Sequence, residues 1–321
     1  MNRALRWALL LGALILLPLW SLLTGPLALS WAEVWQVQDG MTQTVLWQIR
    51  LPRILLAMIA GSSLALSGAL LQNCCRNSLA DPYLFGVVSG AALGATLQQL
   101  LLPSWPGALA FSAFAGSTLA VLLVLLISRL GSGQRLETLL LCGVAISFLF
   151  SALSSALLYV SEPFAANRVM FWLLGSLAQA SYADLQLSLP LLLLLTALSL
   201  LFRRQLDALL LTDESARSLG VPVAALRLMF LLGCAALTAV IVACCGGIAF
   251  IGLMVPHLVR RLFGLSSVAL VLGSVGLGAV FLLGVDTLSR SVFPSQELPV
   301  GVLTSAIGSV FFFSLVLRQQ R

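Results

Sequence analysis

Apolar stretches of about twenty residues recur from one end of this 321-residue chain to the other. A stretch of that length crosses the hydrocarbon core of a bilayer as an α-helix. Charged residues make up only 9% of the chain, against roughly 25% in soluble domains, so much of the apolar surface has to face lipid. A β-barrel would show alternating ten-residue segments, which runs such as 187–201 lack. The sequence therefore predicts an all-α polytopic membrane protein.

The hydropathy pattern predicts about ten transmembrane helices within a single domain, 1–321. They are expected at 7–23, 52–72, 83–102, 107–128, 138–159, 187–202, 223–243, 245–263, 268–288 and 299–317. One further apolar stretch, about 166–180, is too short to cross and is expected to form a half-helix at the outer face. Gly86, Gly90 and Gly94 recur every four residues in the third span, which favours close packing against a neighbouring helix.

The arginines sort to one side of this topology. With the N-terminus in the cytoplasm, thirteen arginines lie on the inner side and four on the outer side, at positions 50, 53, 168 and 290. An excess of positive charge in cytoplasmic loops is the usual bias of membrane proteins. We therefore expect both termini to be cytoplasmic, in a multi-pass protein of the bacterial inner membrane.

The basic residues also exclude several kinds of chemistry. All 17 are arginine, so the chain has no lysine for a phosphate-binding loop and is not its own P-loop ATPase. Six cysteines share the chain with a single histidine and show no C-x-x-C pair, so no metal site is predicted. No convergent nucleophile and base is found either, and we expect no catalytic residues, no bound cofactor and no nucleic-acid partner.

Nearly every ionisable residue falls at the end of a predicted span, which argues against proton coupling because a proton carrier needs a buried titratable group. An ion-coupled secondary transporter of a small organic solute stays open as the alternative, since sodium sites are also built from backbone carbonyls. If the chain is a pump, a separate ATPase has to contact it from the cytoplasm. The inner segment about 207–222, a short polar helix stopped by Gly220, is the natural contact.

Several motifs in order extend over nearly the whole chain. They are WQIRLPR at 47–53, GSSLALSGALLQ at 61–72, RNSLADPYLFGVVSGA at 76–91, FWLLGSL at 171–177, DESARSLGV at 213–221, AFIGLMVPHLVR at 249–260 and ELPVGVLT at 297–304. By these motifs the chain resembles the permease subunits of type II ABC importers for iron chelates (siderophores, haem) and cobalamin. It departs from the family pattern at Ser78 and Val310, where proline is usual.

The resemblance implies a partner set and a role for several groups of residues. A homodimer would bind two ABC ATPase subunits, which hold ATP and Mg, and a periplasmic substrate-binding protein. Docking of that binding protein is implied for Arg50, Arg53 and Arg290, and the cytoplasmic gate for Asn77 and Leu79. ATPase coupling is implied for the segment that contains Asp213, Glu214, Ala216, Arg217 and Gly220.

Uncharged polar residues are expected to line the pathway along the fifth and tenth spans. They are Ser147, Ser151, Ser154, Thr304 and Ser305. Hydroxyl groups without charge suit bulky ligands of many kinds, so the sequence does not distinguish a siderophore from haem or cobalamin.

Overall fold

The computed structural model describes residues 2–25, 40–101, 108–130, 136–292 and 296–319. Ten helices overlap the predicted spans: α1 (Arg3–Leu23), α4 (Leu51–Cys75), α5 (Val87–Leu101), α6 (Ala108–Leu130), α7 (Leu136–Val160), α9 (Tyr182–Leu201), α12 (Val223–Cys245), α13 (Ile251–Phe263), α14 (Ser267–Ser289) and α15 (Val300–Gln319). Seven described helices are long and apolar enough to cross a membrane, and α5 and α15 are shorter apolar helices. The described ranges contain no strand, so the all-α prediction is confirmed, while the count of ten spans stays a prediction.

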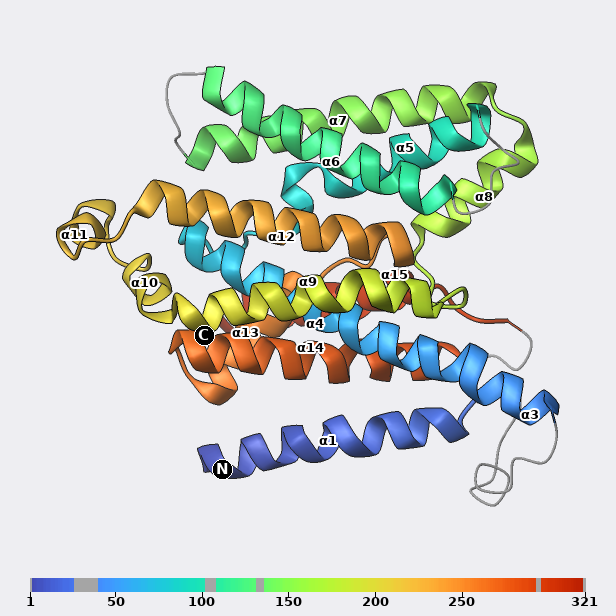
Figure 1. The fold of residues 1–321 in the computed structure, drawn as a ribbon, viewed down its shortest axis with the longest axis horizontal. Helices are drawn as coiled ribbons and strands as arrows, with labels where there is room; N and C mark the ends of the chain where they lie inside the picture. Colours follow the sequence, from blue (N-terminus) through green and yellow to red (C-terminus); the bar gives the residue numbers. More distant parts are fainter. Residues whose placement is uncertain (1, 26–39, 102–107, 131–135, 293–295, 320–321) are drawn as a thin grey trace.

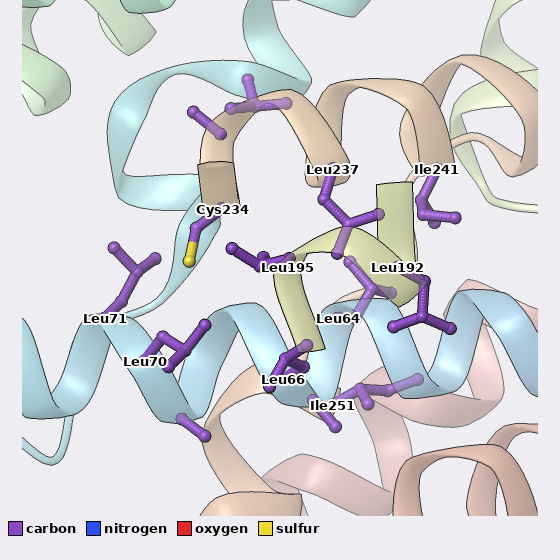
Figure 2. Packing of buried hydrophobic residues seen from close by; sticks show 14 of the residues in the cluster. Leu64, Leu66, Leu70, Leu71, Leu192, Leu195, Cys234, Leu237, Ile241 and Ile251 are labelled. Carbon is purple, nitrogen blue, oxygen red and sulfur yellow. The ribbon is translucent and has the colours of Figure 1, made fainter. Parts of the chain in front are cut away.

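Helix α4 lies at the centre of the bundle and packs against α9, α12, α13 and α14 (Figure 1). Its side chains are buried on nearly every face, and Figure 2 shows leucines of α4 interleaved with those of α9 and α12. Against α14 the two backbones almost touch: a Cβ added to Gly61 would lie 2.1 Å from the carbonyl oxygen of Gly278. Small residues make this approach available, and tight packing is what holds helices together in lipid.

A second group of helices, α5, α6 and α7, lies together along one side of the bundle, and α1 lies on the opposite side (Figure 1). The predicted glycine face of α5 is confirmed by its contact with α6. A Cβ on Gly90 would lie 2.4 Å from the carbonyl oxygen of Gly116, and one on Gly94 would lie 2.0 Å from that of Ser112.

Two predicted spans are shorter as helices than the hydropathy suggests. The third begins as a 3-10 helix, η2 (Pro82–Phe85), and α5 starts only after a left-handed residue at Gly86. The eighth was expected from residue 245, but α13 starts at Ile251 because the backbone leaves helical geometry at Gly246 and Phe250. The Tyr83 hydroxyl joins the two breaks, since it donates to the carbonyl of Ile248 (2.7 Å) and accepts from its amide (2.8 Å). Irregular backbone at membrane depth is tolerated when other protein groups satisfy it in this way.

The second span is longer than predicted. The helix runs without a break from α3 (Gly40–Thr44) through a π-helical turn, η1 (Val45–Arg50), into α4. The second span was predicted to start at Pro52, and proline has no N–H to donate and is best tolerated in the first turn of a helix. The wider π turn just before Pro52 accommodates the missing hydrogen bond, so the helix continues through it.

The two ends of the bundle carry different short helices. The chain termini, α10 (Arg203–Ala208) and α11 (Asp213–Ser218) lie at one end, and α3 and α8 (Pro163–Leu173) lie at the other (Figure 1). Helix α8 is the expected half-helix, but it starts at Pro163 and ends before the left-handed Gly175 instead of reaching residue 180. The arginine distribution assigns the end with α10 and α11 to the cytoplasm, and this assignment stays a prediction.

Candidate functional site: a coupling segment, a gate turn and an arginine cluster

The predicted coupling segment folds into α10, α11 and the turn that follows. Thr212 caps the start of α11, where its side chain accepts a hydrogen bond from the amide of Ser215. After α11 the amide of Gly220 donates to the carbonyl of Arg217 (2.9 Å), and the amide of Val221 donates to that of Ala216 (3.1 Å). This pair of bonds is a Schellman motif, in which the residue after the helix cap is left-handed. Gly220 has φ +78°, as the sequence predicted.

Asp213 ties α11 to two other helices. Its carboxylate is 2.6 Å from the guanidinium of Arg76, which follows the end of α4, and 3.1 Å from that of Arg227 in α12. Arg76 also donates to the carbonyl of Leu211 (2.7 Å), just before α11. The hydrogen bond from Arg227 and the nearby positive charges lower the pKa of Asp213. Asp213 is therefore a fixed negative charge that holds the coupling segment against the bundle.

The other predicted coupling residues divide between the two faces of α11. Ala216 is buried against the bundle, while Glu214 and Arg217 are exposed on the outward face. Leu219 continues that face and is 66% exposed. A short helix with one anchored face and one exposed face of mixed charge and apolar surface suits contact with a soluble protein.

The predicted gate residues lie in the turn immediately after Arg76. The Asn77 side chain accepts a hydrogen bond from the amide of Leu79 (2.9 Å), which is an Asx turn. The same turn leaves the Leu79 side chain 62% exposed, so it is free to meet another surface. Because Arg76 is bonded to Asp213, the gate turn and the coupling segment are joined through one ion pair.

At the opposite end, the predicted docking arginines are buried. Asp286 in α14, fully buried, is 2.9 Å from the guanidinium of Arg53 and 3.1 Å from that of Arg290. Arg53 also contacts Glu297 at 2.9 Å, and Arg290 donates to the Ser21 hydroxyl (2.7 Å). We call Arg53, Asp286, Arg290 and Glu297 the outer charge cluster. It fastens α1, α4, α14 and the segment before α15 to one another.

Arg50 adds a third arginine beside this cluster, where it donates to the carbonyl of Leu22 at 2.5 Å. Within the outer charge cluster itself, two arginines face two carboxylates. The fourth outer arginine, Arg168, is exposed on α8. The family resemblance implies a role toward a partner for Arg53 and Arg290, and the structure adds a second role inside the chain; docking stays a prediction.

The predicted pathway residues do not all share one surface. Ser154 is buried and hydrogen-bonded to Thr96 (2.9 Å), and Thr304 is buried with its hydroxyl on the carbonyl of Gly301 (3.1 Å). Both side chains are therefore buried within this chain, Ser154 against α5 and Thr304 against the first turn of its own helix, α15, and their place on a pathway stays a prediction. Ser151 is exposed, and Ser147 and Ser305 are half-buried.

The sequence reading missed the partners of the buried charges. Asp81 is also buried, and its carboxylate accepts a hydrogen bond from the amide of Tyr83 (2.8 Å) at the start of η2. The i, i+4 spacing of Asp286 and Arg290 was visible in the sequence, but Arg53 is 233 residues from Asp286 and no local pattern joins them. Among the described residues, no group of three or more His, Cys, Asp or Glu side chains could hold a metal ion.

Comparison with known proteins identifies a family and several relatives of this chain. A family model described as the FecCD transport family matches residues 13–318. The hemin transport permease HmuU of Yersinia pestis is 41% identical over 317 residues (97% of this chain, 95% of HmuU). The Fe(3+) dicitrate permease FecD of Escherichia coli K12 is 40% identical, and the match covers 86% of each chain. The vitamin B12 permease BtuC of Salmonella typhi is 36% identical, and the match covers 100% of this chain and 97% of BtuC.

A solved structure agrees with these relatives. A metal-chelate type ABC transporter in an inward-facing conformation superposes with a TM-score of 0.89 at 34% identity, and the match covers 99% of this chain and 100% of the other.

Proposed function

Because the chain belongs to the FecCD transport family and is a permease of an ABC importer for iron chelates, haem or cobalamin, we propose that it works as a homodimer with its pathway at the two-fold axis. Substrate would pass from periplasm to cytoplasm by alternating access. Two ATPase subunits, which hold ATP and Mg, would bind at the cytoplasmic end, and a periplasmic binding protein at the outer end. The chain itself is a translocation component.

The observation that carries this mechanism is the ion pair between Arg76 and Asp213. It joins the segment that would contact the ATPase to the turn that would gate the pathway. Movement of α11 on ATP-driven closure of the ATPase subunits would therefore pull on Asn77 and Leu79 through the backbone of Arg76. Glu214, Arg217 and Leu219 are on the free face of α11 and would form the contact with the ATPase.

For the outer end we propose that Arg50, Arg53 and Arg290 attract carboxylates of the binding protein. Their place at the outer end, with the exposed carboxylate of Glu297 beside them, supports this proposal, because charged groups at a surface set the orientation of a charged partner. Exposed Arg168 on α8 lies at the same end of the bundle and adds a group that a partner can reach. We expect Arg168→Glu to slow capture of the binding protein at low salt, while thermal stability is kept.

Arg53→Glu, in contrast, would abolish capture but would also break the outer charge cluster, so its thermal stability has to be measured beside its binding. Rescue of Arg53→Glu capture by an Asp/Glu→Arg change on the binding protein would support direct pairing. If Arg53→Glu and Arg168→Glu both captured the binding protein normally at low salt, the docking proposal would be wrong.

Reconstitution separates this proposal from the ion-coupled alternative. The permease would be placed in proteoliposomes with its ATPase and binding protein, and uptake of ferric siderophores, haem and cobalamin would be followed. We expect uptake of one of these classes that stops with vanadate and persists after ionophores collapse the proton and sodium gradients. Uptake that survives vanadate and stops with an ionophore would refute the proposal.

A further inference from the structure

A basic pocket at the cytoplasmic end borders the gate turn, and its residues from α13 have no assigned role in the mechanism above. It is a cavity of about 600 Å³ between the end of α4, α10 and the end of α13. Arg76, Arg260, Arg261 and His257 contribute basic groups to its lining. No carboxylate is among the described residues that line it, so we call it the arginine pocket.

Among the described residues, not every arginine of this pocket has a carboxylate partner. Arg76 has Asp213 as its partner. Arg260 instead donates to the side-chain oxygens of Gln72 and Asn73, which are neutral. Arg261 is exposed and makes no hydrogen bond or ion pair within the described part of the chain. Two guanidinium groups therefore share one cavity without a counter-charge from the residues that the structure describes, and Arg260 is held in a fixed orientation by α4.

The rim of the pocket indicates what kind of anion would bind. Leu210 and Leu265 line the same cavity, and their side chains are 47% and 74% exposed. A free anion has no apolar part that could contact the exposed leucines, whereas a phospholipid combines a phosphate with acyl chains. Guanidinium groups bind phosphate oxygens in pairs of hydrogen bonds. Basic pockets between membrane helices on the cytoplasmic side are suited to anionic lipid head groups.

From these observations we propose that the arginine pocket binds the phosphate head group of an anionic phospholipid of the cytoplasmic leaflet. Arg260 and Arg261 hold the phosphate, and Leu210 and Leu265 contact the start of the acyl chains. The site does not depend on which substrate the protein carries. It would hold a lipid beside the end of α4, next to the gate turn.

Native mass spectrometry of the detergent-purified complex tests this site. The complex would be titrated with cardiolipin, phosphatidylglycerol or phosphatidylcholine, and separately with inorganic phosphate. We expect the two anionic lipids to bind more tightly than phosphatidylcholine, and inorganic phosphate at millimolar concentration not to displace them. An arginine near a membrane surface contributes about fivefold to binding, so Arg260→Gln with Arg261→Gln should weaken cardiolipin binding about 25-fold.

The matched control is Arg203→Gln with Arg204→Gln on α10. These arginines are exposed, belong to the same end of the bundle and lie outside the pocket, so cardiolipin binding should change less than twofold. Arg261→Gln alone should weaken cardiolipin binding about fivefold. Because Arg261 makes no hydrogen bond or ion pair within the described part of the chain, this single variant should fold normally and can replace the double variant if Arg260→Gln misfolds.

Three outcomes would overturn the proposal. Equal losses in the pocket and control variants would mean general surface attraction. Displacement of the lipid by millimolar phosphate would mean a site for a free anion. Unchanged lipid binding with loss of the ATPase subunits from the pocket variant would mean that carboxylates of the ATPase occupy these arginines.

Discussion

Removal of the charge on Asp213 should detach the coupling segment without unfolding the bundle. The Asp213→Asn substitution keeps the shape of the side chain and weakens its ion pairs with Arg76 (2.6 Å) and Arg227 (3.1 Å). The Asp213 and Arg76 side chains are both about one-third exposed, so their pair contributes at most about 1 kcal/mol. The Arg227 side chain is more buried and contacts both carboxylate oxygens, which adds roughly another 1 kcal/mol.

A loss of about 2 kcal/mol shifts the equilibrium between the seated and detached segment on the order of 30-fold. Amide hydrogen exchange of residues 212–221 measures this equilibrium, and protection there should fall by that factor while exchange in α4 and α12 changes little. Glu214→Gln is the matched control for exchange: it removes the same charge from the same turn of α11 without touching either arginine.

Two further results test whether the ion pair between Asp213 and Arg76 transmits movement of α11 to the gate turn. In reconstituted complexes Asp213→Asn should lower the amount of substrate moved per ATP hydrolysed, and Asp213→Glu should restore part of it. A double-mutant cycle between Asp213→Asn and Arg76→Gln should give a coupling energy of about 0.5–1 kcal/mol. Additive effects together with unchanged protection of 212–221 would refute the reasoning.

Three other predictions follow from the same contacts. Gly220→Val should destabilise the turn after α11 by about 1–2 kcal/mol because φ is +78°, and should lower transport with insertion kept, whereas Gly12→Val in α1 should leave exchange at 212–221 unchanged. Asp286→Asn should lower the unfolding free energy by about 3–5 kcal/mol because it takes the buried carboxylate from Arg290 and one of two from Arg53, while Glu297→Gln at the exposed rim should cost about 1 kcal/mol or less in the same thermal unfolding assay. The folded-state pKa of Asp213 is lowered, so its stabilisation is fully present above the unfolded pKa near 3.9 and is lost as pH falls through the folded value; exchange protection of α11 should therefore be flat between pH 5 and 8.

The helices were predictable from sequence because each is a local pattern. Apolar length and flanking arginines located all ten overlapping helices, and the left-handed turn at Gly220 followed from a glycine after a short polar helix. The breaks before α5 and α13 were not predictable. Their residues are as apolar as their neighbours, and the Tyr83 contact that makes the breaks tolerable spans 165 positions.

The candidate site was predictable in its residues and less so in its contacts. The arginines 50, 53 and 290 were assigned through the family resemblance, and they also oppose the positive-inside trend, a property of the whole sequence. Their burial around Asp286 depends on how α4 meets α14, where paired glycines bring the backbones together. A sequence pattern gives the spacing of such glycines but not which helix they face.

The two ends of the bundle differ in how they are fastened, and this difference indicates where the protein moves. At the outer end, buried ion pairs and hydrogen bonds of Arg53 and Arg290 connect four segments, and removing Asp286 leaves Arg290 without a carboxylate partner among the described residues. At the cytoplasmic end the coupling segment depends on Asp213, whose bonds to Arg76 and Arg227 are partly open to water and inexpensive to break. Regions that move are drawn from the less stable parts of a fold. A force applied by an ATPase would therefore displace α11 and the gate turn at Asn77 well before it disturbed the outer end.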